Sequence, residues 1–129
     1  MYRTLCHSKI HRATVTEANL NYQGSLTIDQ ALLAAADINT YEKIQVVNIN
    51  NGARFETYAI EGAPDSGVIC ANGAAARWVA RGDLIIIMSY VLISETELSA
   101  FKPNFVYVDA QNKILNRHHH IPEKTEAGF

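Results

Sequence analysis

Hydrophobic and polar residues alternate along much of this chain, and this pattern is typical of strands. It predicts short strands over residues 2–6 and 10–16, rich in β-branched residues with basic residues between them. Residues 42–60 predict a β-hairpin, because alternating segments flank a turn at Asn50-Asn51-Gly52. On its return strand Arg54, Glu56 and Tyr58 share one face, since alternate residues of a strand point the same way.

The most hydrophobic run, over residues 84–88, predicts a central strand that is buried on both faces and continues to residue 93. Further strands are expected over residues 68–71 and 105–108, the second followed by a turn at 111–113. Lys9 lies just before the strand over residues 10–16 and His11 lies within it, and both are expected on one face.

Helices are expected to be few and short. Thr27 and Gln30 form a capping box, which predicts a helix that ends near Asp37 and buries a stripe of four residues: Ile28, Leu32, Leu33 and Ala36. Short helices are also expected over residues 72–78 and after Ser94. Many short strands with brief helices predict a mainly β protein, a small β-barrel with a few short helices.

Composition narrows the function classes. The 129 residues suit one domain, and a net charge of −2 gives no general attraction for nucleic acid or anionic membranes. No apolar run approaches the roughly 20 residues of a membrane span, and the N-terminus is too polar for a signal peptide. Cys6 and Cys70 are too few for a disulfide framework. We therefore expect a cytoplasmic protein with reduced thiols.

The C-terminal segment is polar from Arg117 onward, so we predict a domain over residues 1–116 and a polar tail over 117–129. The tail begins with His118-His119-His120. No further cluster of Cys or His residues completes a metal site there, and none is expected.

One dipeptide can carry unusual chemistry. In Tyr22-Gln23-Gly24-Ser25 the Ser25 hydroxyl lies next to the Gly24 carbonyl, and glycine allows strained backbone conformations. Attack of this hydroxyl on that carbonyl would shift the acyl group from nitrogen to oxygen, and β-elimination would then break the chain. Most Gly-Ser pairs lie in ordinary turns. A serine just before a helix is usually its N-cap, but Thr27 is the predicted cap here, so Ser25 is not needed for capping.

Several segments together resemble the pyruvoyl-dependent aspartate 1-decarboxylase family. The resemblance covers about residues 1–115, in family order, and rests on the segments 9–12 (KIHR), 22–25 (YQGS), 28–29 (ID), 51–60 (NGARFETYAI), 72–76 (NGAAA) and 82–86 (GDLII). Some members carry tryptophan where this chain has Val47. The tail from Arg117 lies outside the resemblance.

The resemblance implies a double-psi β-barrel that assembles as a tetramer with active sites between subunits. It implies self-cleavage between Gly24 and Ser25 into a β chain, 1–24, and an α chain, 25–129, on which Ser25 becomes a covalent pyruvoyl cofactor. The substrate would be L-aspartate, and the products β-alanine for pantothenate synthesis and carbon dioxide. A Schiff base with the pyruvoyl ketone would serve as the electron sink, as pyridoxal phosphate does elsewhere.

The resemblance also implies residue roles. Tyr58 would protonate the carbanion as a general acid, and Arg54 would bind a substrate carboxylate, with Lys9 of a neighbouring subunit as a further candidate. Thr57 would polarise the Gly24 carbonyl during cleavage. Further substrate contacts would come from Thr57 and the backbone of Gly73, Ala74 and Ala75, and support for the site from His11, Tyr22 and Asn72.

Two alternatives remain open from the sequence. One is an uncleaved, non-catalytic β-barrel that binds a ligand or a partner. The other is a processed hydrolase whose free N-terminal Ser25 acts as a nucleophile. The number of chain fragments distinguishes the first, and the mass of the larger fragment distinguishes the second.

Overall fold

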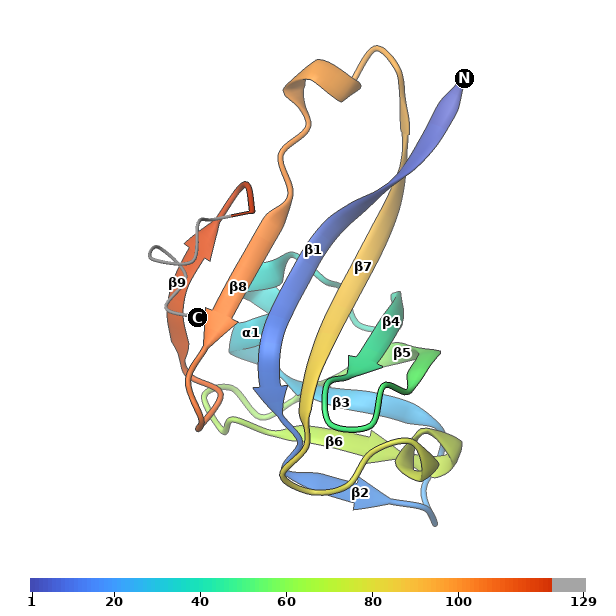
Figure 1. Cartoon of the computed structure of the whole chain (residues 1–129), viewed down its shortest axis with the longest axis vertical. Coiled ribbons are helices and arrows are strands. Elements are labelled where there is room, and N and C mark those ends of the chain that lie inside the picture. The colour runs from blue at the N-terminus through green and yellow to red at the C-terminus, as the bar shows by residue number, and fades with distance from the viewer. Residues whose placement is uncertain (122–129) are drawn as a thin grey trace.

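The computed structural model describes residues 1–121, and strands dominate it (Figure 1). The strands are β1 (Tyr2–Thr14), β2 (Glu17–Asn19), β3 (Ser25–Asp29), β4 (Lys43–Asn48), β5 (Arg54–Gly62), β6 (Ile69–Asn72), β7 (Leu84–Ser94), β8 (Asn104–Val108) and β9 (Ile114–His118). The helices are α1 (Gln30–Ala36) and two 3-10 helices, η1 (Gly73–Arg77) and η2 (Leu98–Ala100). The prediction of a mainly β, small barrel-like fold with a few short helices is confirmed.

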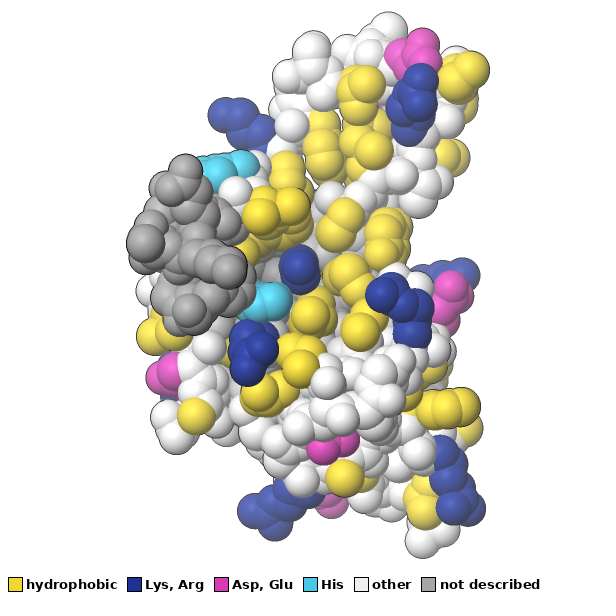
Figure 2. All heavy atoms as spheres, in the orientation of Figure 1, with side chains coloured by type: hydrophobic (Ala, Val, Ile, Leu, Met, Phe, Trp, Pro, Cys, Tyr) yellow, Lys and Arg dark blue, Asp and Glu magenta, His cyan; other side chains and the backbone are white. Residues whose placement is uncertain are grey.

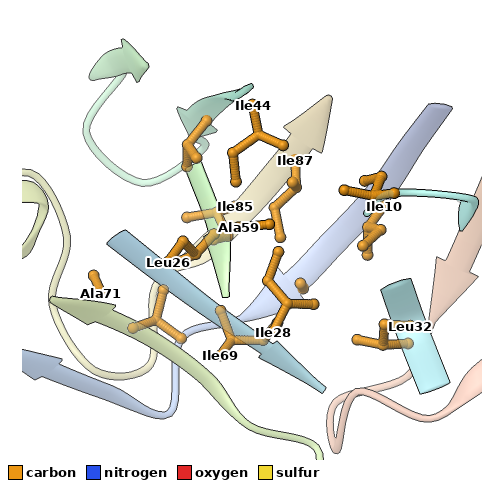
Figure 3. Close-up of a cluster of buried hydrophobic side chains, with 14 of the residues drawn as sticks. Ile10, Leu26, Ile28, Leu32, Ile44, Ala59, Ile69, Ala71, Ile85 and Ile87 are labelled. Carbon is orange, nitrogen blue, oxygen red and sulfur yellow. The ribbon is translucent and has the colours of Figure 1, made fainter. Parts of the chain in front are cut away.

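The strands form one curved sheet in the order β2-β6-β3-β5-β4-β7-β1-β8-β9. Three neighbouring pairs are parallel, β1–β8, β2–β6 and β3–β5, and the others are antiparallel. Side chains from strands far apart in this order meet in one core (Figure 3), among them Ile10, Leu26, Ile44, Ile69, Ile87 and, from α1, Leu32. The sheet therefore wraps around its own hydrophobic face.

β1 is one strand of 13 residues where the sequence predicted two. Its pairing with β7 shifts register between Cys6 and Ser8 and again between Ile10 and Ala13, and Arg12 has a φ of 62° at the second shift. Such bulges bend a strand without ending it, so β1 follows the curve of the barrel. The first half of β1 and the second half of β7 project from the body as a ribbon (Figure 1).

β7 is not buried on both faces, and that prediction is wrong. Ile85 and Ile87 are fully buried in the core, but Ile86 and Met88, which alternate with them, are partly exposed. β7 lies between β4 and β1 in a single layer, so only one of its faces meets the core. Figure 2 shows hydrophobic side chains gathered on the outward face over β1 and β7.

α1 begins at Gln30, two residues later than a cap at Thr27 predicts. Thr27 lies in β3, where it pairs with Ile60 of β5 and Cys70 of β6, and these ladders keep it extended. Asp29 caps the helix instead, accepting a 2.8 Å hydrogen bond from the Ala31 N–H. Leu32, Leu33 and Ala36 are buried as predicted, and the helix ends at Asp37 in a left-handed conformation.

The predicted hairpin is confirmed as β4 and β5, which pair from Lys43–Tyr58 to Val47–Arg54. Its turn contains Gly52 at a φ of 75°, a value that glycine adopts without strain.

At the other end of the chain β9 pairs with β8 and extends through His118, two residues past the predicted domain boundary. None of the described helices has the length and apolarity to span a membrane.

Candidate active site

The Gly24–Ser25 peptide lies where β3 begins. Ser25 is the first residue of β3, and its side chain is fully buried, whereas Gly24 is exposed. Across the sheet Ser25 pairs with Asn72, the last residue of β6, and η1 begins immediately after it. Two segments separated by 47 residues in the sequence therefore meet at this peptide.

Asn72 holds the Ser25 hydroxyl in place. Its Nδ2 donates to Ser25 Oγ at 3.0 Å and to Thr27 Oγ1 at 2.9 Å. The Ser25 hydroxyl in turn donates to the Gln23 carbonyl at 3.4 Å, a long hydrogen bond. This hydroxyl is thus buried, oriented by a side-chain amide and directed along the backbone that precedes it.

The special backbone conformation belongs to Gly73 and not to Gly24. Gly73 has a φ of 64°, and a Cβ on it would lie 2.7 Å from both the Gly24 nitrogen and the Tyr22 carbonyl oxygen. Gly24 does not have a positive φ. The first residue of η1 must therefore lack a side chain so that the backbone before Ser25 can pack against it.

Tyr58 lies beside the start of β3. Leu26 of β3 pairs in parallel with Ala59 of β5, so Tyr58 is one residue before this pair, as Ser25 is. The Tyr58 side chain is 36% exposed, and its ring centroid is 6.4 Å from that of Tyr41. Its phenol is therefore accessible from outside the barrel.

Arg54 is exposed, four residues before Tyr58 on the same strand. Its Nη1 donates to Gln45 Oε1 at 3.0 Å, and the Tyr90 hydroxyl donates to the same oxygen at 2.8 Å. No ion pair within residues 1–121 involves Arg54. Its guanidinium thus contacts a neutral partner and retains N–H groups that can donate hydrogen bonds to a carboxylate.

Thr57 lies between Arg54 and Tyr58 but alternates with them, so its side chain points to the opposite face of β5. It pairs with Ile44 of β4 and is partly buried. Among the described residues no hydrogen bond joins the Thr57 side chain to the Gly24 carbonyl. The oxyanion role of Thr57 stays a prediction.

Lys9 and His11 lie away from Ser25 within one chain. Both are on β1, which β7, β4 and β5 separate from β3 in the sheet. The Lys9 ammonium is 5.9 Å from the centroid of the Phe105 ring, and the His11 ring is 5.2 Å from that of Tyr107. Burial, together with the charges of Lys9 and Arg12, lowers the pKa of His11 to about 4, so its imidazole is neutral at pH 7.

The remaining predicted residues lie just before Ser25 or in η1. Tyr22 is exposed, and its carbonyl lies against Gly73. Within η1, Ala74 is exposed and Ala75 is buried. The part of the chain that the structure describes contains no group of three or more His, Cys, Asp or Glu residues arranged to hold a metal ion.

Two contacts of the site were not predicted. The Cys70 thiol donates to Asn72 Oδ1 at 3.2 Å, and Thr27 accepts from Asn72 Nδ2. The sequence predicts Thr27 as a helix cap, so its place in this cluster is not expected. Had a strand been predicted over residues 25–29, it would have placed Ser25 and Thr27 on one face. By the same alternation Cys70 and Asn72 share one face of their strand.

A comparison with protein families decides the identity. The aspartate decarboxylase family profile matches residues 1–115. The chain belongs to the aspartate decarboxylase family. The family resemblance that the sequence predicted is therefore confirmed.

Curated aspartate 1-decarboxylases resemble this chain along most of its length. The protein from Neisseria meningitidis is 61% identical over 114 residues, which cover 88% of this chain and 90% of that protein. The protein from Acetivibrio thermocellus is 61% identical over 116 residues, covering 90% and 92%. The protein from Methylobacillus flagellatus is 54% identical over 122 residues, covering 95% and 97%.

Proposed function

We propose that this chain cuts its own backbone between Gly24 and Ser25 and then decarboxylates L-aspartate to β-alanine and carbon dioxide. Membership of the aspartate decarboxylase family supports the reaction and its substrate. The observation that carries the cleavage site is the buried Ser25 hydroxyl, which the Asn72 amide holds beside the Gly24 peptide. The β-alanine product would supply pantothenate synthesis.

The cleavage uses only atoms of the chain and one water molecule. Ser25 Oγ bonds to the Gly24 carbonyl carbon, the bond from that carbon to the Ser25 nitrogen breaks, and the nitrogen takes up the hydroxyl proton. Loss of the Ser25 Cα proton then expels Gly24 as a carboxylate and leaves a double bond between Cα and Cβ. Water replaces the nitrogen, which leaves as ammonia, and residue 25 becomes a pyruvoyl group.

The surroundings of residue 25 fit such a group. A pyruvoyl group is small, uncharged and rich in carbonyl oxygens, and the fully buried position of Ser25 favours an uncharged group. The Asn72 amide nitrogen, now a donor to Ser25 Oγ, is the kind of partner that a carbonyl oxygen requires. The ketone supplies an electron sink for the pair of electrons that carbon dioxide leaves behind.

The other residues of the chain bind the substrate and move a proton. Arg54 binds a carboxylate of aspartate through its guanidinium, which forms no ion pair within the described chain. Tyr58 gives its phenolic proton to the substrate carbon after carbon dioxide leaves. Thr57 and the backbone of Gly73, Ala74 and Ala75 add contacts, and His11 and Tyr22 support the site.

The proposed active form is a tetramer of cleaved protomers. Lys9 and Ser25 are separated by three intervening strands within one chain, which supports a Lys9 contributed by a neighbouring subunit. A second cation near the substrate would complement its second carboxylate. An active site between subunits would then require assembly for activity.

Intact mass under denaturing conditions tests the cleavage. It should show fragments of 24 and 105 residues, the larger one lighter by one ammonia than a fragment with a free N-terminal serine. Ser25→Ala should stay whole. A single full-length mass after prolonged warm incubation contradicts spontaneous cleavage, and a larger fragment that keeps its amine favours the hydrolase alternative. Borohydride added with aspartate should attach substrate to the N-terminus of the larger fragment.

A further inference from the structure

We propose that Cys70 and Thr27 are positioning residues for self-cleavage, which together fix the Asn72 amide with its nitrogen toward the Ser25 hydroxyl. The inference rests on the proposed cleavage at Gly24–Ser25 and extends it to two residues that do not touch the reacting carbonyl.

The four residues form two cross-strand pairs between β3 and β6 that are neighbours on one face of the sheet, with the Leu26–Ala71 pair between them on the other face. Ser25 pairs with Asn72, and Thr27 pairs with Cys70. Cross-strand neighbours on one face of a sheet lie close enough for their side chains to interact. Asn72 is 4% exposed, so water cannot readily replace any of its partners.

The Asn72 amide has a hydrogen-bond partner for each hydrogen of its Nδ2 and one for its Oδ1. One hydrogen of Nδ2 is directed to Ser25 Oγ at 3.0 Å, and the other to Thr27 Oγ1 at 2.9 Å. Oδ1 accepts from the Cys70 thiol at 3.2 Å. The contact with Asn72 is shorter than the one with the Ala71 carbonyl, which lies at 4.0 Å, and the Glu17 side chain on β2 is a further hydrogen-bond partner of this thiol.

Cys70 decides which way the amide points. A hydroxyl can donate or accept, so Ser25 and Thr27 would satisfy either end of the Asn72 amide. A thiol is a weak donor and a weak acceptor with one proton to offer, so Cys70 suits Oδ1 better than an NH₂ group whose two hydrogens each need an acceptor. With the amide reversed, its NH₂ group would face the sulfur, and at least one buried N–H would lose a good acceptor.

The thiol is protonated under ordinary conditions, as a donor must be. Burial first, and the neighbouring Glu17 carboxylate second, raise the pKa of Cys70. Glu17 is the direct neighbour of Cys70 on β2, so this charge is built into the sheet. At neutral pH the thiol therefore keeps its proton.

The orientation matters for the attack of Ser25. An N–H donor directed at Oγ stabilises negative charge on this oxygen as its proton leaves. A reversed Asn72 would present Oδ1 instead, which would hold the hydroxyl proton and repel the developing charge. Only the observed orientation therefore favours the acyl shift.

Cleavage kinetics of newly made chains test the proposal. Wild type and variants are produced by cell-free synthesis and sampled over time by intact mass. Cys70→Ala and Thr27→Val should cleave roughly three- to tenfold more slowly, the effect of losing one buried hydrogen bond. Thr27→Ser retains the hydroxyl, and Cys70→Ser replaces the thiol with another donor, so both should cleave within about twofold of wild type, as should Cys6→Ala, the matched control at the other cysteine.

A second measurement separates positioning from folding. In the uncleavable Ser25→Ala background, asparagine is labelled with ¹⁵N, and hydrogen exchange of the Asn72 side-chain amide is followed by NMR. Exchange should be at least threefold faster after Cys70→Ala and should return toward the parent rate with Cys70→Ser. Thermal unfolding of the same proteins shows whether each variant is folded.

The outcomes are distinct. If wild type never cleaves, the proposed function fails, and the positioning role fails with it. If wild type cleaves and folded Cys70→Ala keeps pace, or if Cys70→Ser is as slow as Cys70→Ala, only the positioning role is overturned. Slow cleavage of Cys70→Ala with unchanged Asn72 exchange also overturns it.

Discussion

Gly73 packs directly on the backbone of Gly24, since a Cβ on residue 73 would lie 2.7 Å from the Gly24 nitrogen and 2.8 Å from its Cα. Real Cβ atoms do not approach backbone atoms this closely. The contact joins the start of η1 to the peptide that we propose is cleaved. The position of the cleavage peptide therefore depends on a glycine 49 residues away.

Gly73→Ala should slow cleavage by at least tenfold. The new methyl group must push the backbone of residues 22–24 away, and attack within the peptide requires its groups to stay aligned. Gly52→Ala is the matched control, because Gly52 also has a positive φ but has nothing within 4 Å of an added Cβ. Intact mass over time measures both, and equal rates for the two variants would show that the contact does not control cleavage.

Tyr58→Phe should cleave normally and lose at least a hundredfold in kcat, because general acid catalysis typically contributes about 10²–10⁴-fold. The substitution keeps the ring near Tyr41 and removes only the hydroxyl. Carbon dioxide release measures turnover, normalised to the fraction of cleaved chains. Tyr41→Phe is the control and should retain activity. Wild-type turnover in fully cleaved Tyr58→Phe would assign the proton to another group.

Arg54→Ala should lose at least tenfold in kcat/KM for aspartate, since hydrogen bonds to charged groups contribute about 1.5–3 kcal/mol and the variant lacks the guanidinium that would form them. Arg54→Lys should recover only part of this loss, because lysine lacks the planar fork that meets a carboxylate. Arg81→Ala, an exposed arginine in a turn, is the control. Full activity of cleaved Arg54→Ala would make Lys9 the next candidate for the carboxylate anchor.

Replacing His11 should reduce the acid sensitivity of folding. The folded pKa is about 4 and the ordinary value is 6.5, so between these pH values the unfolded chain binds a proton that the folded chain does not. His11 thus lowers the free energy of unfolding progressively as pH falls from 6.5 to 4, and adds no further loss below pH 4.

Urea unfolding at pH 7, 5.5 and 4.5 checks this expectation. The free energy of unfolding should fall less over this range in His11→Gln than in wild type. His119→Gln, which changes an exposed imidazole, is the control. Parallel pH profiles for wild type and His11→Gln would show that this imidazole does not titrate differently in the two states.

Local sequence determined the elements whose signals act over a few residues. The hairpin of β4 and β5 follows from alternation on both sides of a turn with Gly52 at a positive φ, and Asp37 ends α1 where the apolar stripe ends. The segments shared with the family, and their order, are also present in the sequence itself and predict the family without any tertiary contact. These features depend on neighbours in the chain, so the sequence carries them.

Tertiary structure decided what depends on distant partners. Thr27 carries a good capping signal, yet ladders to Ile60 and Cys70 keep it in β3, because hydrogen bonds with two flanking strands outweigh one cap. The outward face of β7 is exposed because a single curved sheet covers its core from one side only. The Asn72 amide meets Ser25 only through the pairing of β3 with β6, and register between segments 47 residues apart is set by the packing of the whole barrel.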